Sequence, residues 1–200
     1  MQKGIFITIY GINNIGKSTN AKLLVEKLEN AGHKAVYLKY PVYDLEPSGP
    51  FLNKILRNSG VQKISEDELQ LWFILNRYQF ESSLKKLLND GNIVIAEDYI
   101  GTGIAWGVAK GLDQKWLEDA NKHLLKEDLA ILLIGERHTM SKEKVHVHEQ
   151  NDELAKKCAN VFETLADKFG WEKIIVQKKA EDTSNLLFDL CKRFIGNFRK

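Results

Sequence analysis

The sequence has few cysteines, few prolines and no long apolar run, and each shortage excludes a class of protein. Cys158 and Cys191 are its only cysteines, so a disulfide-stapled secreted scaffold is excluded and two reduced, semi-buried thiols are expected. No apolar run approaches the ~20 residues of a membrane-spanning helix. Residues 1–10 lack the features of a signal peptide and have the pattern of a strand. We therefore expect a cytoplasmic protein without a membrane partner.

An excess of charge of one sign is also missing. Lys and Arg number 29 against 27 Asp and Glu, which leaves a formal net charge of +2. This charge is too small, and too evenly interleaved, to predict binding to a nucleic-acid polymer. Hydrophobic residues make up 44% and charged residues 28%, as in folded globular proteins, and 200 residues suit one domain.

Predicted strands and helices alternate along the whole chain. The strands are short and continuously apolar, and we expect them at 5–10, 35–38, 93–96, 129–134 and 174–176. We expect helices at 17–31, 51–57, about 66–89 after a capping box, 113–125, 151–169 and 183–198. Buried strands alternating with helices predict an α/β fold, a three-layer sandwich with a five-stranded parallel sheet. Residues 1–200 form one expected domain, with a charged, aperiodic lid at about 135–150.

A phosphate-binding loop follows the first expected strand. Gly11 to Ser18 fit the pattern G-x-x-x-x-G-K-[ST] between a strand and a helix. In such a loop the backbone N–H groups surround ATP phosphates, Lys17 reaches the β- and γ-phosphates, and the Ser18 hydroxyl ligates Mg²⁺. The loop residues expected to bind ATP are Gly11, Asn13, Asn14, Ile15, Gly16, Lys17, Ser18 and Thr19.

A GTPase would use the same loop, so the other motifs must separate the two classes. Asp98-Tyr-Ile-Gly101 fits the DxxG element of a GTPase. The base-reading [NT]KxD motif is missing, because Asn121-Lys-His-Leu124 lacks the aspartate. The motifs therefore favour a P-loop kinase.

The long central helix carries a second candidate site. Six of the seven residues from Leu69 to Leu75 are apolar, so this part of the helix is expected to be buried. Phe73 and Arg77 are four residues apart and share one side. Two interpretations remain open: Arg77 forms a structural ion pair with an interior carboxylate, or the ring and the guanidinium bind a flat heterocycle.

Three segments together resemble the thymidylate kinase family. They are the phosphate loop, Leu-x-Phe73-x-x-Asn76-Arg77, and Glu97-Asp98-Tyr99-x-x-Thr102-Gly103-x-Ala105-Trp106. Residues 46–49 and 56–57 also resemble the family's segment after the second strand, so the resemblance covers about residues 4–110. It implies ATP-dependent phosphorylation of the small acceptor dTMP, or a related nucleotide, by a homodimer.

The resemblance implies a role for each matching residue. Lys17 and Glu97 would be catalytic, and Glu97 would ligate Mg²⁺ together with Ser18. Phe73 would stack on the acceptor base, and Arg77 would hydrogen-bond its edge. The closing lid would bring Lys142 or Lys144 onto the phosphates of ATP. The residues expected around the acceptor are Phe73, Arg77, Asp98, Tyr99, Thr102, Trp106, Tyr43 and Arg57.

Four departures from the family pattern concern the acceptor. Asn13 replaces the usual acid, residues 42–45 lack the usual arginine, and the lid has lysines and histidines where arginines are expected. Glu97-Asp98-Tyr99 replaces the usual Asp-Arg-Tyr. The two missing arginines would hold the acceptor's phosphate. Because neighbouring strand residues point to opposite faces, only one of Glu97 and Asp98 need face the nucleotide, and an inward Asp98 would disfavour a monophosphate.

These departures keep two alternatives open. Deoxynucleoside kinases use a glutamate at the end of the third strand as the base for a 5′-hydroxyl, and Glu97 matches it, although the arginine that usually follows is missing. A nucleotide-binding switch or inactive paralogue is the second alternative.

Two further groups of polar residues have ordinary explanations. His146, His148 and Glu149 could form a metal cluster, but we expect them to be polar lid side chains. Lys178 and Lys179 lie either near the adenine or in a solvated turn.

Overall fold

The computed structural model describes residues 3–57, 64–136 and 152–198. Its strands are β1 (Ile5–Tyr10), β2 (Ala35–Lys39), β3 (Ile93–Glu97), β4 (Leu129–Ile134) and β5 (Glu172–Ile175). Its helices are α1 (Lys17–Asn30), α2 (Ser48–Arg57), α3 (Glu66–Asn89), α4 (Ile100–Ala109), α5 (Gln114–Asn121), α6 (Asp152–Phe169) and α7 (Ala180–Phe198). The expected lid lies outside the described residues, apart from Gly135 and Glu136.

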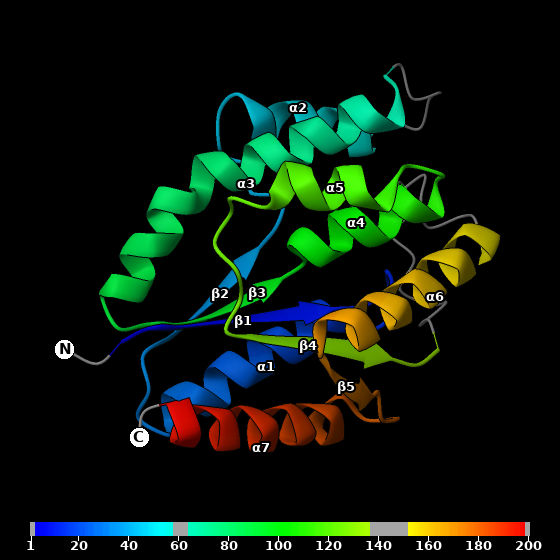
Figure 1. The fold of residues 1–200 in the computed structure, drawn as a ribbon. Helices are drawn as coiled ribbons and strands as arrows, with labels where there is room; N and C mark the ends of the chain where they lie inside the picture. Colours follow the sequence, from blue (N-terminus) through cyan, green and yellow to red (C-terminus); the bar gives the residue numbers. More distant parts are fainter. Residues whose placement is uncertain (1–2, 58–63, 137–151, 199–200) are drawn as a thin grey trace.

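The strands form one parallel sheet in the order β2-β3-β1-β4-β5. Figure 1 shows α1 and α7 against one face, and α3, α4, α5 and α6 on the other side. The predicted three-layer α/β sandwich with a five-stranded parallel sheet is therefore confirmed.

The central strand β1 is buried on both faces. Ile5 and Ile7 pack into the core under α1 and α7, whereas Phe6 and Tyr10 pack into the core under α4 and α6. Because both faces of β1 are buried, its sequence is continuously apolar and does not alternate between apolar and polar residues.

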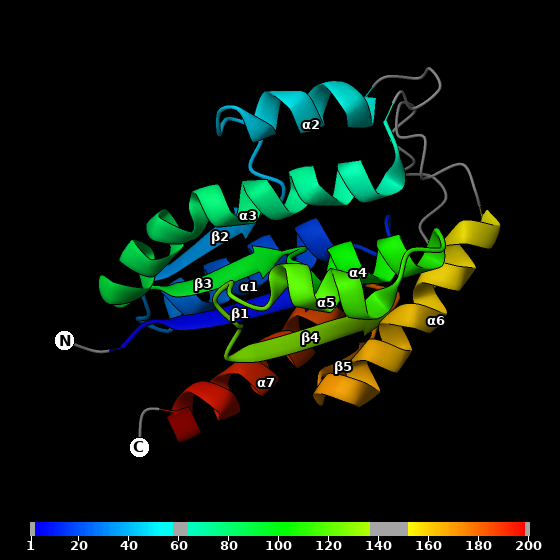
Figure 2. The same ribbon diagram turned by 45° about the horizontal axis from the view of Figure 1, so that its top comes forward.

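A crevice is expected at the carboxyl ends of β1 and β3. The two strands are neighbours in register from Ile5 opposite Ile93 to Ile9 opposite Glu97. β1 leads to α1 on one side of the sheet, and β3 leads to α4 on the other, as Figure 2 also shows. Adjacent strands whose connections leave on opposite faces form a topological switch point, where ligands bind in open α/β sheets.

The sequence pattern did not predict α4, and several element boundaries differ from the expected ones. α4 has glycines at 101, 103 and 107 and is largely apolar, so it shows no helical period. A Cβ on Gly101 would lie 2.4 Å from Trp171 Cη2, and one on Gly107 would lie 2.6 Å from Leu117 Cδ1. The glycines therefore allow close packing, which overrides their low helix propensity. α2 begins at Ser48 rather than at residue 51, α7 at Ala180 rather than at residue 183, and β5 at Glu172 rather than at residue 174. β5 ends at Ile175 rather than at residue 176, and α5 ends at Asn121 rather than at residue 125.

The two cysteines agree with the expectation from the sequence. Cys158 on α6 and Cys191 on α7 are both buried and free, as expected of reduced thiols. Among the helices of the described ranges, none combines the length and the apolar character needed to cross a bilayer.

Candidate active site

A cavity of about 710 Å³ opens at the carboxyl ends of β1, β2 and β3. It brings together most of the residues that the sequence singled out: Asn13, Asn14, Gly16, Lys17, Ser18, Thr19, Tyr43, Arg57, Phe73, Arg77, Glu97, Asp98, Tyr99, Thr102 and Trp106. Gly11 and Ile15 do not line it, and Ile15 is buried in the core. Lys142, Lys144 and the proposed cluster of His146, His148 and Glu149 lie outside the described residues. Lys178 lines the cavity beside Gln177.

The phosphate loop has the backbone geometry that its glycines permit. Gly11 and Gly16 have φ angles of 144° and 92°, and Asn14 adopts the left-handed conformation at 64°. α1 begins at Lys17, so its N-terminal N–H groups face the loop. The buried Lys17 Nζ donates to Gly11 O at 2.8 Å and to Ile12 O at 3.0 Å, which holds the ammonium group across the loop.

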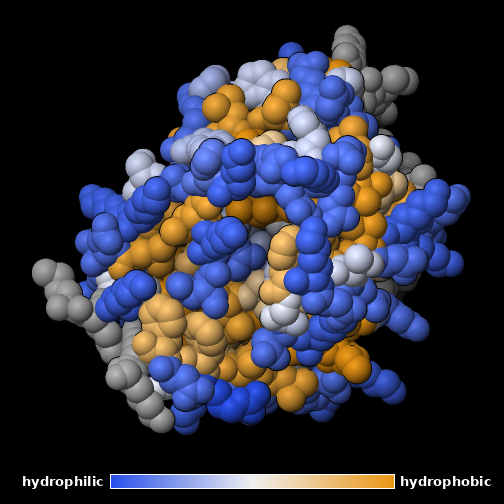
Figure 3. All heavy atoms as spheres, viewed as in Figure 1, coloured by the Kyte–Doolittle hydropathy of each residue, from blue (hydrophilic) through white to orange (hydrophobic). Residues whose placement is uncertain are grey.

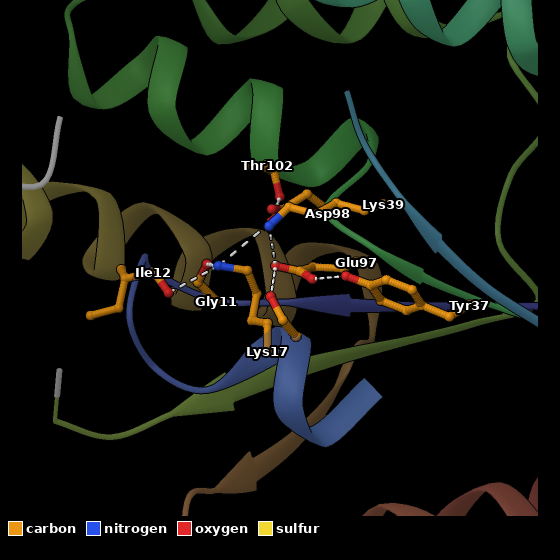
Figure 4. A network of polar contacts seen from close by, with 9 residues as sticks. Gly11, Ile12, Lys17, Tyr37, Lys39, Glu97, Asp98 and Thr102 are labelled. Carbon is orange, nitrogen blue, oxygen red and sulfur yellow. Dashed lines mark hydrogen bonds and ion pairs between the residues drawn. The ribbon is translucent and has the colours of Figure 1, made fainter. Parts of the chain in front are cut away.

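Glu97, at the end of β3, connects three elements (Figure 4). Its Oε1 accepts from Ser18 Oγ at 2.8 Å and lies 3.2 Å from Lys39 Nζ, and its Oε2 accepts from Tyr37. Burial favours the protonated form, but Lys39, Lys17 and the two hydroxyl donors outweigh it and lower the pKa of Glu97. The carboxyl group is therefore ionised at neutral pH.

The pair of Ser18 and Glu97 fits a magnesium ion. A hydroxyl and a carboxylate in contact are oxygen ligands of the kind that Mg²⁺ takes beside substrate phosphates. The part of the chain that the structure describes has no group of three or more His, Cys, Asp and Glu residues that could hold a metal. An ion here would take its remaining ligands from phosphate oxygens and water.

Asp98 lines the cavity together with Glu97, although the alternation of strand residues required only one of the two acids to face it. β3 ends at Glu97, and Asp98 has a φ of 61°, which breaks the alternation of the strand. Its Oδ1 accepts from Thr102 Oγ1 at 2.8 Å and lies 3.7 Å from Lys17 Nζ. Burial, together with the nearby Glu97, raises the pKa of Asp98 against the opposing effect of Lys17.

Arg77 lines the cavity and has polar atoms without hydrogen-bond partners in the described chain. Its side chain is buried, and its only hydrogen bond to a described residue is a long one from Nη1 to Tyr99 O, at 3.4 Å. Nε and Nη2 have no partner there, and no carboxylate of the described ranges pairs with the guanidinium. Burial lowers the pKa of Arg77 to about 10, so the group stays charged at neutral pH. Of the two interpretations, the structural ion pair is therefore not formed.

Four residues beside the predicted ones were missed as site residues or barely considered. Lys39 and Gln70 line the cavity, and Tyr37 contacts Glu97. Asn76 also lines it, and its side chain is fully buried. Gln70 could have been found by its spacing of three and seven residues before Phe73 and Arg77. Tyr37 and Lys39 gave no such signal, because they join the site only through the pairing of β2 with β3.

Asn76 fastens the loop after β2 to α3. Its Oδ1 accepts from Val42 N at 2.8 Å, and its Nδ2 donates to Val42 O at 2.9 Å and to Ser48 Oγ at 2.8 Å. The loop also carries Tyr43, whose ring lies 5.8 Å from the Arg57 guanidinium carbon. Asn76 is therefore a positioning residue for this wall of the cavity.

A phosphate loop between β1 and α1, a carboxylate bonded to its serine, and a second polar pocket in the same cavity define a P-loop kinase domain. The comparisons with known proteins make the assignment more specific. A family model described as thymidylate kinase matches residues 9–185, and the chain belongs to the thymidylate kinase family.

Individual relatives agree over nearly the whole chain. A probable thymidylate kinase of Thermococcus kodakarensis is 31% identical over 96% of this chain and 99% of its own. The thymidylate kinase of Dictyostelium discoideum is 27% identical over 100% of this chain and 89% of its own. The solved structure of thymidylate kinase from Candida albicans superposes with a TM-score of 0.81 at 25% identity, covering 96% of this chain and 92% of that one. The resemblance in the motifs is therefore confirmed.

Asn76→Ala should destabilise the protein, because it leaves the polar groups of Val42 and Ser48 without their buried partner. We expect a loss of about 2–4 kcal/mol in the free energy of unfolding, measured in urea. The control is Asn89→Ala on the exposed end of the same helix, which should change stability by less than about 0.5 kcal/mol. Equal effects of the two substitutions would contradict the positioning role of Asn76.

Proposed function

We propose that this chain is a thymidylate kinase that transfers the γ-phosphate of ATP to the phosphate of dTMP. The observation that carries this is a single cavity lined both by the phosphate loop and by Phe73 and Arg77, whose guanidinium has no carboxylate partner in the described chain. Membership of the family supports the reaction. The Candida albicans relative is described as having broad substrate specificity, so related monophosphates belong in the test.

In the proposed mechanism, the chain binds ATP through the phosphate loop and the N-terminus of α1. Lys17 turns from the loop carbonyls to the transferring phosphate, and Ser18 and Glu97 would hold Mg²⁺. When bound, the ion neutralises charge on the phosphates during transfer. Phe73 and Trp106 hold the acceptor base, and Arg77 donates to its edge. Positioning and charge neutralisation account for most of the rate. The closing lid would add Lys142 or Lys144.

The acceptor's phosphate must be held without the usual arginines, and we assign this task to Lys39. Asp98 repels a phosphate less than an isolated carboxylate would, because Thr102 donates a hydrogen bond to it and Lys17 Nζ lies 3.7 Å from its Oδ1. Lys39 reaches into the same cavity from the end of β2, and its side chain is 46% exposed, so it can leave Glu97. The Lys39 ammonium group, carried on a flexible side chain, can attract the acceptor's phosphate as a point charge where the family usually has an arginine that donates two hydrogen bonds.

The contacts of Glu97 argue against a deoxynucleoside kinase. A base that takes a proton from a 5′-hydroxyl works best with a pKa near the working pH. Lys39 and Lys17, together with the hydroxyl groups of Tyr37 and Ser18, lower the pKa of Glu97 instead. The family assignment also favours a monophosphate acceptor over a nucleoside, and an enzyme over an inactive switch.

Replacing Lys17 tests the phosphate-transfer site. ADP release with ATP–Mg²⁺ and dTMP should fall by about 100-fold or more in Lys17→Ala, because a charge aimed at the transferring phosphate is lost. The unfolding transition should persist. Lys192→Ala, an exposed change on α7, serves as the control. Near-normal turnover in Lys17→Ala would refute the loop assignment. Turnover of nucleosides but of no monophosphate would refute the proposed acceptor.

Replacing Lys39 tests the acceptor-phosphate assignment separately. Lys39→Met should raise the KM for dTMP by about 10-fold or more, the effect of losing one charged hydrogen bond, with little change in the KM for ATP. Thymidine, which has no phosphate, should bind equally well to the variant and the wild type in calorimetry. Lys34→Met, just before β2 and exposed, is the control. If Lys39→Met weakened the binding of thymidine and of dTMP by the same factor, Lys39 would not contact the phosphate.

We also propose a homodimer that forms through α3. Leu71, Leu75 and Tyr78 are 51%, 39% and 38% exposed, and their spacing of four and three residues places them on one stripe of the helix. Figure 3 shows apolar atoms exposed among polar ones at the top of this view, over α2 and α3. The cavity residues Phe73 and Arg77 lie elsewhere on the same helix, so dimerisation would leave the site open.

A charge on the α3 stripe should separate the subunits. Leu71→Asp combined with Leu75→Asp should sediment as a monomer where the wild type sediments as a dimer, because two charges would be buried unpaired at the interface. Leu186→Asp changes an equally exposed leucine (46%) on α7 and should leave the dimer intact. A wild type that stays monomeric at micromolar concentration would refute the proposal.

A further inference from the structure

Gln70 is a buried amide in the wall of the acceptor cavity. It lies on α3, only 2% of its surface is exposed, and it lines the cavity together with Phe73 and Arg77. The spacing of three and four residues between these three side chains places them on one face of the helix. Gln70 therefore belongs to the surface that an acceptor base would contact.

The amide oxygen of Gln70 and the guanidinium of Arg77 both lie beside Gly103 of α4. A Cβ on Gly103 would lie 3.2 Å from Gln70 Oε1, 3.1 Å from Arg77 Nη2 and 3.3 Å from Arg77 Nη1. Gln70 Oε1, Arg77 Nε and Arg77 Nη2 all lack hydrogen-bond partners in the described chain. A buried polar atom without a partner costs about 1–3 kcal/mol, so three together indicate a site that a ligand completes.

The positive charge of Arg77 determines whether the oxygen or the nitrogen of the Gln70 side-chain amide faces it. Amide dipoles orient in the local field, and the carbonyl oxygen is the negative end. Gln70 therefore presents its oxygen beside the guanidinium, so that the cavity wall offers an acceptor next to a set of donors. A glycine at 103 leaves room for both side chains, because even a methyl group there would press on each of them.

We propose that Gln70 is the specificity-determining residue of the acceptor site and that its Oε1 accepts the N3–H of a thymine or uracil base. Arg77 then donates to O4 of the same base. This rests on the proposed function, in which the cavity holds the acceptor nucleotide. Cytosine presents an amino group in place of O4 and a bare N3. Its donor would face the donors of Arg77 and its acceptor would face Gln70 Oε1, so the wall rejects cytosine by leaving both groups unpaired.

Gln70→Met tests the proposal, because methionine keeps the length of the side chain and removes the acceptor. The preference for dTMP over dCMP, as the ratio of their kcat/KM values, should fall by about 10-fold or more, while the KM for ATP stays unchanged. Gln79→Met is the matched control, since Gln79 lies on the same helix, bonds to Glu46 O and does not line the cavity. Equal losses for dTMP and dCMP would show that Gln70 only packs the wall, and would overturn the proposal.

A second probe changes the acceptor base rather than the cavity wall. The N3-methyl analogue of dTMP cannot donate from N3, so the wild type should use it at least about 10-fold less well than dTMP, and Gln70→Met should discriminate much less. Wild-type discrimination that persists in full in the variant would contradict the role of Gln70.

Equilibrium binding separates this proposal from the proposed reaction. Calorimetry with thymidine and deoxycytidine reports base selection even if no acceptor is phosphorylated. A preference for thymidine that Gln70→Met removes would support the assignment of Gln70 without turnover. Equal binding of both nucleosides to the wild type would overturn the assignment, even if dTMP kinase activity were present.

Discussion

The parallel pairing of β1 with β3 is the constraint on which the site depends. It sets Ile9 opposite Glu97, so the phosphate loop that follows one strand meets the carboxylate that ends the other. The 2.8 Å bond between Ser18 and Glu97 is the direct result. Because the two strands continue into helices on opposite faces, the crevice between them stays open for a ligand. The core on both sides of β1 holds this register in place.

Charge balance explains how two acids can sit in a phosphate-binding cavity. Lys17 lies beside Asp98 and Lys39 lies beside Glu97, so each acid has a basic partner within the cluster. A cluster of this kind can exchange partners when phosphates enter, since each lysine has a carboxylate to leave and a phosphate to bind. The departure from the family pattern at Asp98 therefore does not exclude a monophosphate acceptor.

The long helix α3 organises the acceptor end through several of its faces. One face presents Phe73 and Arg77 to the cavity, and Asn76 ties the neighbouring loop to the helix. A third stripe exposes Leu71 and Leu75. The expectation that the whole apolar stretch from Leu69 to Leu75 is buried is therefore wrong at Leu71 and Leu75, which lie on the exposed side of the helix.

The sequence by itself determined the sheet, most helices and the phosphate loop, because those depend on local periodicity and on a motif of contiguous residues. It did not reveal α4, whose glycines serve close packing against Trp171 and Leu117. It also did not show that Asp98 faces the cavity, or that Gln70 and Lys39 join the site. Those outcomes depend on a left-handed residue at the end of β3, on helix packing and on the pairing of β2 with β3. Only the tertiary structure decided them, because burial and distance between residues far apart in the chain leave no local pattern to read.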